Sequence, residues 1–364
     1  MPDRSIARQA LRDGHLIKPI MIGLIGPFTL LVSLACSLIA QPGPTVSVYA
    51  EGFLNPRGLA FGADGALYVA EAGTGGRTRV VVDTGKRYNI GLSGRISRVA
   101  TPGQRSDYLT GLPSAFTSHD DDVGPASLTV LGDSMYLLTA AGGTEVGDPQ
   151  YNNGVFRMTS DGLVKLLDLN DFNLTYPSQA RLNDPVKVDV PGGMPWGIAT
   201  LGNRLYVTEA NHEFILEVTA DGQARRILEH PHSNRVFTGI SAGPDGWLYV
   251  AELGPYPYLE GSGDVIRVSP AGEVEMVAQG LTTPIAATMT REGVLYVLEF
   301  SAPLRQVPNS GRVIRILPSG EHTIIHEKLH FPTAMIMGED GALYISNSGH
   351  LANKSEGQIV RIKL

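Results

Sequence analysis

The stretch "GPDGWLYVAELGP" (243–255) decides the fold, because close copies of it recur along the chain. The copies are "GADGALYVAE" (62–71), "LGDSMYLLT" (131–139), "LGNRLYVTE" (201–209), "GPDGWLYVAE" (243–252), "TREGVLYVLE" (290–299) and "GEDGALYISN" (338–347). In most of them a two-residue turn such as Asp245-Gly246 precedes a short apolar run, which is a strong local signal for a β-hairpin. The six copies therefore predict six hairpins.

Further strands complete each unit. The strand before each turn carries a small residue at one register, namely Gly58, Ser127, Gly197, Gly239, Ala286 and Ala334. Small residues let neighbouring backbones approach closely, so these strands should be the innermost ones around a common axis. A third strand such as "DVIRVS" and a fourth such as "AGEVEMVAQGL" (271–281) follow the hairpin. The sequence thus predicts an all-β, six-bladed β-propeller of four-stranded antiparallel blades.

The two ends of the repeat region predict how the ring closes. The last unit stops after its third strand, "GQIVRIKL", whereas "TVSVYAEGFLNP" (45–56) matches the fourth strand "EVEMVAQGLTTP" (273–284). We therefore expect residues 45–364 to form a single propeller, in which the N-terminal strand completes the last blade. This pairing should bury Val46, Val48 or their neighbours and remove an open sheet edge.

Residues 1–44 are expected to form a cytoplasmic basic flank, a signal peptide or membrane anchor, and a short linker. Four basic residues precede an uncharged run from Pro19 to Ala40 that is long enough to cross a bilayer. The remainder should be extracytoplasmic, either secreted or anchored by residues 19–40, and cleavage, retention and lipidation all stay open. Cys36, the one cysteine, lies in this run, so the exported part has no disulfide.

Charge limits the partners. The formal net charge is −7, with 29 Lys and Arg against 36 Asp and Glu, so the acidic body does not attract nucleic acid. Membrane contact is expected only through the N-terminal segment. The expected partner is a small molecule or a protein.

Insertions predict which face carries the binding site. They occupy residues 73–94, 114–125, 141–154 and 170–193. Each falls between strands two and three of a blade or between strand four and the next blade, and these connections share one face, here called the elaborated face. The opposite, tight-turn face has only short turns. Elaborated loops on a rigid scaffold are where binding usually lies.

Polar residues recur where the second strands end. They are Glu71, Glu209, Glu252 and Glu299, with Thr139 and Asn347 at the equivalent positions. We expect a polar ring around the channel mouth, and the favoured interpretation is that these side chains accept hydrogen bonds from backbone N–H groups of neighbouring loops. The alternative is that some of them converge on a cation or polar ligand.

Other candidate ligand-binding residues lie nearby. Arg57 and Trp196 precede the small residue of their strands and could bind an anionic or aromatic ligand. Alternatively, Arg57 neutralises Glu71 and Trp196 plugs the channel. Tyr256 and Tyr258 occupy a proline-stiffened loop, "LGPYPYLEGSG" (253–263), that is suited either to an aromatic or hydrophobic partner or to simple packing.

Three weaker patterns complete the survey. The acidic stretch "SHDDDVG" (118–124) is interpreted as a solvated loop, with Ca²⁺ binding as the alternative. His212, His230 and His232 are interpreted as surface residues, with a metal site as the alternative. The repeated arginines of the third strands should lie over the tyrosines of the second strands. The sequence shows no nucleophile–base–acid set, zinc spacing or phosphate loop.

With these motifs in place, residues 46–364 resemble the ScyD/ScyE family of exported, NHL-like six-bladed propellers. The resemblance rests on "GPDGWLYVAELGPYPYLEGSGDVIRV", "GVLYVLEF" with "GRVIRI", and "GEDGALYISNSG" with "GQIVRI". It implies an extracytoplasmic propeller linked in some cases to secondary metabolism. The "LYVxE" pattern is also similar to the "LWFTE" blades of streptogramin lyases, which use a glutamate and a histidine with a divalent metal. The six innermost strands here contain no histidine.

Two functions follow from these observations. The first is a non-catalytic propeller that binds a small molecule or protein on the elaborated face. It needs no cofactor, although a divalent cation such as calcium is left open. The second is a metal-dependent lyase or lactonase with Glu71, Glu209, Glu252 or Glu299 as ligand or general base.

Overall fold

The computed structural model describes residues 43–364 apart from eight gaps. The gaps are 82–86, 117–121, 141–151, 180–191, 231–234, 256, 303–306 and 351–354. Residues 1–42, His119 to Asp121, Tyr256 and His232 therefore lie outside the described residues. No helix in the described part is long and apolar enough to cross a membrane.

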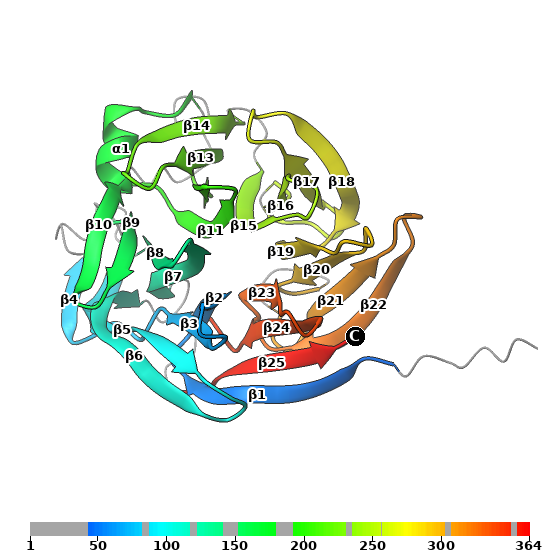
Figure 1. Cartoon of the computed structure of the whole chain (residues 1–364), viewed down its shortest axis with the longest axis horizontal. Coiled ribbons are helices and arrows are strands. Elements are labelled where there is room, and N and C mark those ends of the chain that lie inside the picture. The colour runs from blue at the N-terminus through cyan, green and yellow to red at the C-terminus, as the bar shows by residue number, and fades with distance from the viewer. Residues whose placement is uncertain are drawn as a thin grey trace, which may run out of the picture. The chain divides into compact units, whose positions relative to one another are not determined.

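Four blades are separate four-stranded antiparallel sheets (Figure 1). The first contains β11 (Pro195–Leu201), β12 (Arg204–Glu209), β13 (Phe214–Val218) and β14 (Ala224–Glu229). The second contains β15 (Val236–Ala242), β16 (Leu248–Leu253), β17 (Gly263–Val268) and β18 (Val274–Leu281). The third contains β19 (Pro284–Met289), β20 (Leu295–Glu299), β21 (Gly311–Ile316) and β22 (His322–Leu329). The fourth contains β23 (Ala334–Met337), β24 (Ala342–Asn347), β25 (Gly357–Lys363) and β1 (Thr45–Phe53).

The remaining strands form one nine-stranded sheet. Its strands are β2 (Pro56–Phe61), β3 (Leu67–Glu71), β4 (Thr78–Val81), β5 (Arg87–Val99), β6 (Arg105–Phe116), β7 (Asp122–Leu131), β8 (Ser134–Ala140), β9 (Gly154–Thr159) and β10 (Gly162–Asp168). The prediction of six separate blades is therefore corrected to four separate blades and this joined sheet. The join is a short pairing of β6 with β7 through Ala115↔Val123 and Phe116↔Asp122. It forms because the insertion at 114–125 continues both strands, and pairing satisfies their backbone groups.

The predicted closure of the ring is confirmed. β1 pairs antiparallel with β25 from Thr45↔Lys363 to Phe53↔Gly357, so the first strand is the outermost strand of the last blade (Figure 1). Ala50 and Phe53 are buried, whereas Val46 and Val48 are 41% and 52% exposed. The expected burial thus falls on the neighbours of the two valines, because one face of an outermost strand remains in contact with solvent.

The innermost strands are also those predicted. β2, β7, β11, β15, β19 and β23 contact one another in this order, and β23 contacts β2, so they surround the centre of Figure 1. A Cβ atom on Gly58 would lie 2.4 Å from Ser127 Cα, and one on Gly239 would lie 2.3 Å from Ile285 O. The small residues are therefore required by the close approach of neighbouring inner strands.

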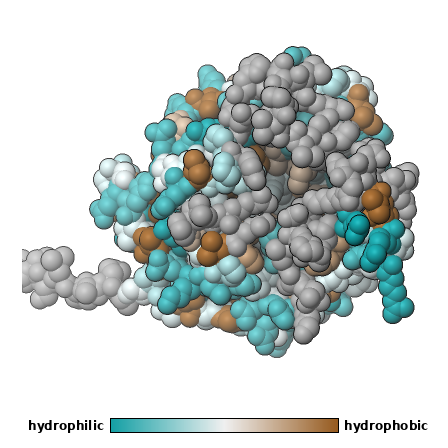
Figure 2. Space-filling model, turned by 180° about the vertical axis from the view of Figure 1, so that it is seen from behind, coloured by the Kyte–Doolittle hydropathy of each residue, from teal (hydrophilic) through white to brown (hydrophobic). Residues whose placement is uncertain are grey.

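The inserted segments extend beyond the ends of the second strands. Glu71, the last residue of β3, pairs with Arg95, so the part of β5 that precedes Arg95 projects past the blade and pairs there with β4. The short helix α1 (Leu169–Thr175) follows β10 and begins at Asp168, whose side chain accepts from the backbone N–H groups of Asn170 and Asp171. The described surface in Figure 2 is mainly hydrophilic, with apolar residues scattered singly.

A repeated contact fixes the hairpins of the tight-turn face. Asp245 accepts from Tyr249 Oη at 2.9 Å and from Arg267 Nη1 at 3.0 Å, and Tyr249 pairs with Arg267 in the sheet register. Corresponding Asp–Tyr–Arg sets lie at 64, 68 and 98 and at 340, 344 and 361. In all three hairpins the third-strand arginine pairs with the second-strand tyrosine in the sheet register. The predicted position of the arginine over the tyrosine ring is confirmed for Arg361 and Tyr344, at 5.9 Å, whereas Arg267 lies over Trp247 at 4.6 Å.

Candidate functional site

The polar residues that end the second strands are buried, and four of them bind a backbone N–H group just before the first strand of their own blade. Leu54 N donates to Glu71 Oε2 at 2.5 Å, and Thr282 N donates to Glu299 Oε1 at 2.6 Å. The equivalent bonds run from Met194 N to Glu209 Oε1 and from His330 N to Asn347 Oδ1. The favoured interpretation, hydrogen bonding to neighbouring loops, is confirmed for these four.

Two of the buried glutamates, Glu71 and Glu299, also form an ion pair with an arginine. Arg95 Nη2 lies 2.8 Å from Glu71 Oε2, so the cation beside Glu71 is Arg95 rather than the Arg57 that the sequence suggested. Arg312 Nε pairs with Glu299. Burial nevertheless raises the pKa of Glu299 above its usual range, although Arg312 and the backbone N–H of Thr282 oppose that effect.

Glu252 has a different environment. Its only ion-pair partner among the described residues is Arg235, with Nη1 3.9 Å from Oε2, because Arg235 binds Asp264 more closely. Glu252 and Asp264 face each other across the β16–β17 pairing, and both are buried. Burial, together with the charges of Asp264 and Glu213, raises the pKa of Glu252 to about 7, and Arg235 only partly opposes the shift. A carboxyl that ionises near neutral pH can both accept and donate a proton.

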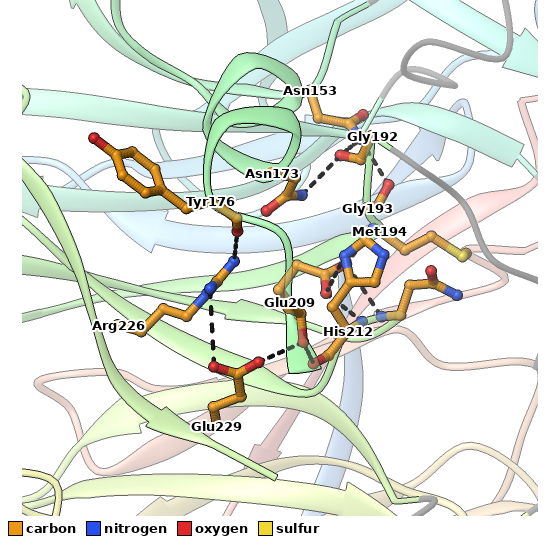
Figure 3. Close-up of polar contacts among 12 residues, drawn as sticks. Asn153, Asn173, Tyr176, Gly192, Gly193, Met194, Glu209, His212, Arg226 and Glu229 are labelled. Atoms are coloured by element: carbon orange, nitrogen blue, oxygen red, sulfur yellow. Dashed lines mark hydrogen bonds and ion pairs between the residues drawn. The ribbon is translucent and has the colours of Figure 1, made fainter. Parts of the chain in front are cut away.

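The neighbouring blade holds a second polar network, shown in Figure 3. Glu209 accepts from His212 N at 2.5 Å, and His212 Nδ1 lies 3.5 Å from Glu209 Oε2. Arg226 lies over the ring of Phe214 at 4.5 Å and donates to Tyr176 O, which follows α1. The prediction that His212 is a surface residue is wrong, since its side chain is buried under these contacts.

Hydrogen bonds of the same network hold both described ends of the insertion at 170–193 in place. Glu229 Oε1 accepts from Ser178 Oγ at 2.5 Å and from Gln179 N at 2.7 Å. At the other end Asn153 Nδ2 donates to Gly193 O at 2.8 Å, and Asn173 Nδ2 donates to Gly192 O at 3.1 Å (Figure 3). Sequence reasoning missed these roles, because Arg226 and Glu229 lie on an outer strand with no distinguishing motif.

The central cavity is separate from both networks. It has a volume of about 1220 Å³ and is lined mainly by the innermost strands, with Arg57 and Trp196 in its wall. Glu71, Glu209, Glu252 and Glu299 are not among its lining residues. The carboxylates of Glu71, Glu209 and Glu299 accept from buried loop N–H groups. Those of Glu71, Glu252 and Glu299 lie beside an arginine.

The structure also describes Tyr258, His230 and the side chains that could bind a metal ion. Tyr258 is half-buried with a positive φ of 63°, in a turn where its N–H donates to Pro255 O at 2.8 Å. Burial and Arg235 lower the pKa of His230, whose ring packs against Phe237. Within the described ranges, no group of three or more His, Cys, Asp and Glu side chains is arranged to hold a metal ion.

No protein-family model matches the sequence. No curated protein matches it either.

Solved structures with a similar fold include three enzymes. The PQQ-bound aldose sugar dehydrogenase of Streptomyces coelicolor is 15% identical with a TM-score of 0.57, over 88% of this chain and 98% of that one. A gluconolactonase of Xanthomonas campestris is 12% identical with a TM-score of 0.53, over 88% and 89%. An inactive virginiamycin B lyase of Staphylococcus aureus, solved with quinupristin, is 15% identical with a TM-score of 0.50, over 88% and 99%. At these identities the likeness shows the fold, a β-propeller, and nothing further.

Proposed function

We propose that this protein is a propeller enzyme that hydrolyses a small ester or lactone, with Glu252 as its general base. The observation that carries the proposal is the buried Glu252 carboxyl, whose pKa of about 7 sets it apart. General bases work best when their pKa lies close to the operating pH. A gluconolactonase and a lyase among the solved structures of similar fold are consistent with this class of chemistry.

The neighbours of Glu252 supply the other parts of such a reaction. Ionised Glu252 accepts a proton from water, whose oxygen forms a bond to the lactone carbonyl carbon. Arg235, which is 31% exposed, stabilises the negative charge that develops on the carbonyl oxygen. The ring C–O bond then breaks, and protonated Glu252 returns the proton to the departing alkoxide. Asp264 positions Arg235 through their ion pair.

Burial favours hydrolysis over elimination. The Glu252 side chain is only 3% exposed, so water reaches it more easily than a bulky substrate carbon does. The metal that the sequence-based alternative assumed does not fit this cluster, because Arg235 already supplies the positive charge beside Glu252 and Asp264. We therefore assign no step to a metal ion.

The test uses the purified full-length protein and two variants. Glu252→Gln should lower the rate of proton release from δ-valerolactone or dihydrocoumarin by about a hundredfold or more, the usual contribution of a general base. Glu299→Gln is the matched control, because Glu299 ends the second strand of the next blade and is held by Arg312. Its rate per folded molecule should stay close to that of the wild type.

Two results would overturn the proposal as a whole, and a third would exclude the role of Glu252. One is an undiminished rate in Glu252→Gln, and the other is the absence of lactone hydrolysis by the wild type. A rate that does not rise as pH passes through 7 would also exclude Glu252 as the base.

The sequence-based predictions of blade number, family and location are also part of the proposal. We propose that the nine-stranded sheet acts as two blade units, so that the ring has six, and that the chain is a member of the ScyD/ScyE family. We also propose that it works outside the cytoplasm on a small molecule, without nucleic acid. The support for export is the basic flank and uncharged run of residues 1–40.

A further inference from the structure

The β4–β5 extension, in which β4 pairs with the first part of β5, has one buried and one exposed face. Val80 pairs with the buried Tyr88, and both belong to a small apolar cluster beneath the extension. Side chains alternate along a strand, so Arg79 and Val81 point to the opposite face. Arg87 shares that exposed face, because it is paired with Val81 and paired residues lie on the same side of a sheet.

The exposed face of the extension is positively charged. Arg79 on β4 and Arg87 on β5 are exposed, and so is Arg77, which directly precedes β4. Within the described ranges, none of these three side chains forms an ion pair or a hydrogen bond. Asn89, which lies opposite Arg79, is neutral. The three arginines, here called the arginine patch, therefore stand out on a chain with a formal net charge of −7.

Other surface arginines of the ring have carboxylate partners. Arg225 Nη2 lies 3.0 Å from Glu217 Oε2, and the two residues are paired in the sheet register. Arg267 Nη2 lies 2.5 Å from Glu275 Oε2, again in register. These cations are neutralised within their own blades, whereas the charges of the arginine patch remain for another molecule.

β4 is also an edge strand. It pairs with β5 on one side and, among the described residues, with no strand on the other. Figure 1 shows it at the periphery of the ring. Unpaired backbone N–H and C=O groups along a sheet edge can accept a further strand from an extended chain. Charge and backbone donors are thus presented together at one edge.

We propose that β4 binds an extended acidic segment of a partner protein, which adds a strand to the sheet at this edge. The segment pairs with β4 through its backbone, and its carboxylates, at alternate positions, lie on the exposed face beside Arg77 and Arg79. Guanidinium groups suit carboxylates because they offer two parallel donors. The inference does not rest on the proposed hydrolysis, since Glu252 lies on β16 in another blade.

Charge and pairing together favour this occupant. Antiparallel pairing of β4 with the same strand of a second copy would bring two sets of arginines together, and like charges on neighbouring strands are destabilising. A lipid surface would use the arginine patch but would leave the backbone edge of β4 unpaired. An acidic extended segment satisfies both features.

The test measures binding of fluorescent peptides to the purified full-length protein by anisotropy. The probe is a short blocked peptide in which glutamate and threonine alternate. Two control peptides have the same composition. One has its glutamates consecutive, which changes the spacing of the charges, and the other has methylated backbone nitrogens, which removes the donors. The alternating peptide should bind saturably and about tenfold more tightly than either control.

Variants test the arginine patch. Arg79→Glu should weaken binding of the alternating peptide about tenfold, because it replaces attraction by repulsion at the edge. Arg87→Glu leaves β4 unchanged and should weaken binding less, since Arg87 lies one strand further from the peptide. Arg291→Glu is the control, because Arg291 is exposed in a turn of the tight-turn face, and it should bind as the wild type does. Circular dichroism identifies a variant that fails to fold, and the other patch variant then decides.

Several results would overturn the proposal. They are the absence of saturable binding of the alternating peptide, equal affinity for it and either control peptide, and equal effects of Arg79→Glu and Arg291→Glu. Binding to vesicles that contain phosphatidylserine, without binding to the peptide, would assign the patch to lipid instead. A wild-type dimer that Arg79→Glu dissociates would assign the edge to a second copy.

Discussion

Glu71 and Glu252 occupy the same position in different blades but have different electrostatic environments. Glu71 has Arg95 at 2.8 Å and accepts a short hydrogen bond from Leu54 N, so its charge is compensated where it is buried. Glu252 shares Arg235 with Asp264 and lies near Glu213. The negative charge at this repeated position is therefore compensated at Glu71, whereas ionisation of Glu252 is disfavoured by its surroundings.

The raised pKa of Glu252 predicts a dependence of stability on pH. In the unfolded chain this carboxyl has its ordinary pKa of 4.5, whereas burial raises its pKa in the folded protein to about 7. As pH rises from 4.5 to 7, the unfolded state gains charge first, so the stability present below 4.5 is progressively lost. Glu252→Gln lacks this loss. Its melting temperature relative to that of the wild type should rise between pH 4.5 and 8, by an amount corresponding to about 3 kcal/mol. A constant difference across that range would contradict the shifted pKa.

Removal of the charge at Glu71 should change stability in the opposite direction. Glu71→Gln should lower the free energy of unfolding by about 2 kcal/mol, since it leaves Arg95 and Leu54 N without their charged acceptor. Glu51→Gln, an exposed position on β1, is the control and should change stability little. Urea unfolding at pH 7 measures both, and equal effects would show that the Glu71 contacts contribute nothing specific.

At the scale of elements, the outer strand β14 holds the insertion that contains α1. Arg226 donates to Tyr176 O and lies over Phe172 at 5.5 Å, and Glu229 binds Ser178 and Gln179. These contacts come from one strand and reach a segment about 50 residues earlier in the chain. The insertion is thus attached to the neighbouring blade at several points.

Arg226→Ala should therefore loosen α1 without unfolding the ring. Hydrogen exchange in residues 169–179 should become faster, while the inner strands keep their protection. Arg225→Ala is a closely matched control, because Arg225 precedes Arg226 on β14 but its side chain is 57% exposed and pairs with Glu217. If both variants exchange alike, Arg226 does not anchor the helix.

The sequence repeat made the inner strands predictable, because a small residue recurs at one register from Gly58 to Ala334. It also made the ring closure predictable, because the last repeat ends with its third strand. The join of β6 to β7 was not, since only two residue pairs form it and the insertion has no hairpin signal. The orientation of the glutamates was predictable only in part. The hydrogen bonds to loops could be predicted, because the loop N–H groups need acceptors. The raised pKa of Glu252 could not, because it depends on how Arg235 is shared with Asp264, and Arg235 belongs to no repeated position.

At the scale of the whole molecule, β1 contacts both the last blade, through its pairing with β25, and the nine-stranded sheet, since Tyr49 O accepts from Gly103 N at 2.8 Å. It covers β25 and buries Ala50 and Phe53 in a cluster that also contains Leu59 and Tyr344. That cluster joins the last blade to the nine-stranded sheet. Removing β1 should therefore weaken the ring at one interface and, through it, the whole fold.

A protein that starts at Asn55 should consequently melt markedly lower than one that starts at Gln41, or express poorly. The loss includes the backbone ladder of β25 as well as the apolar cover, so it should exceed that of a frayed terminus. Differential scanning calorimetry of the two proteins makes the comparison. Equal melting temperatures would contradict the structural role of the closure.

The pairing of Thr45 with Lys363 has a consequence for chain connectivity. A short peptide could join these two residues, and the chain could be opened instead at the exposed turn of Ser160 and Asp161, between β9 and β10. Such a circular permutant would begin with β10 and end with β9, which pair antiparallel. The seam of the ring would then lie in another blade, again between the first and the last strand.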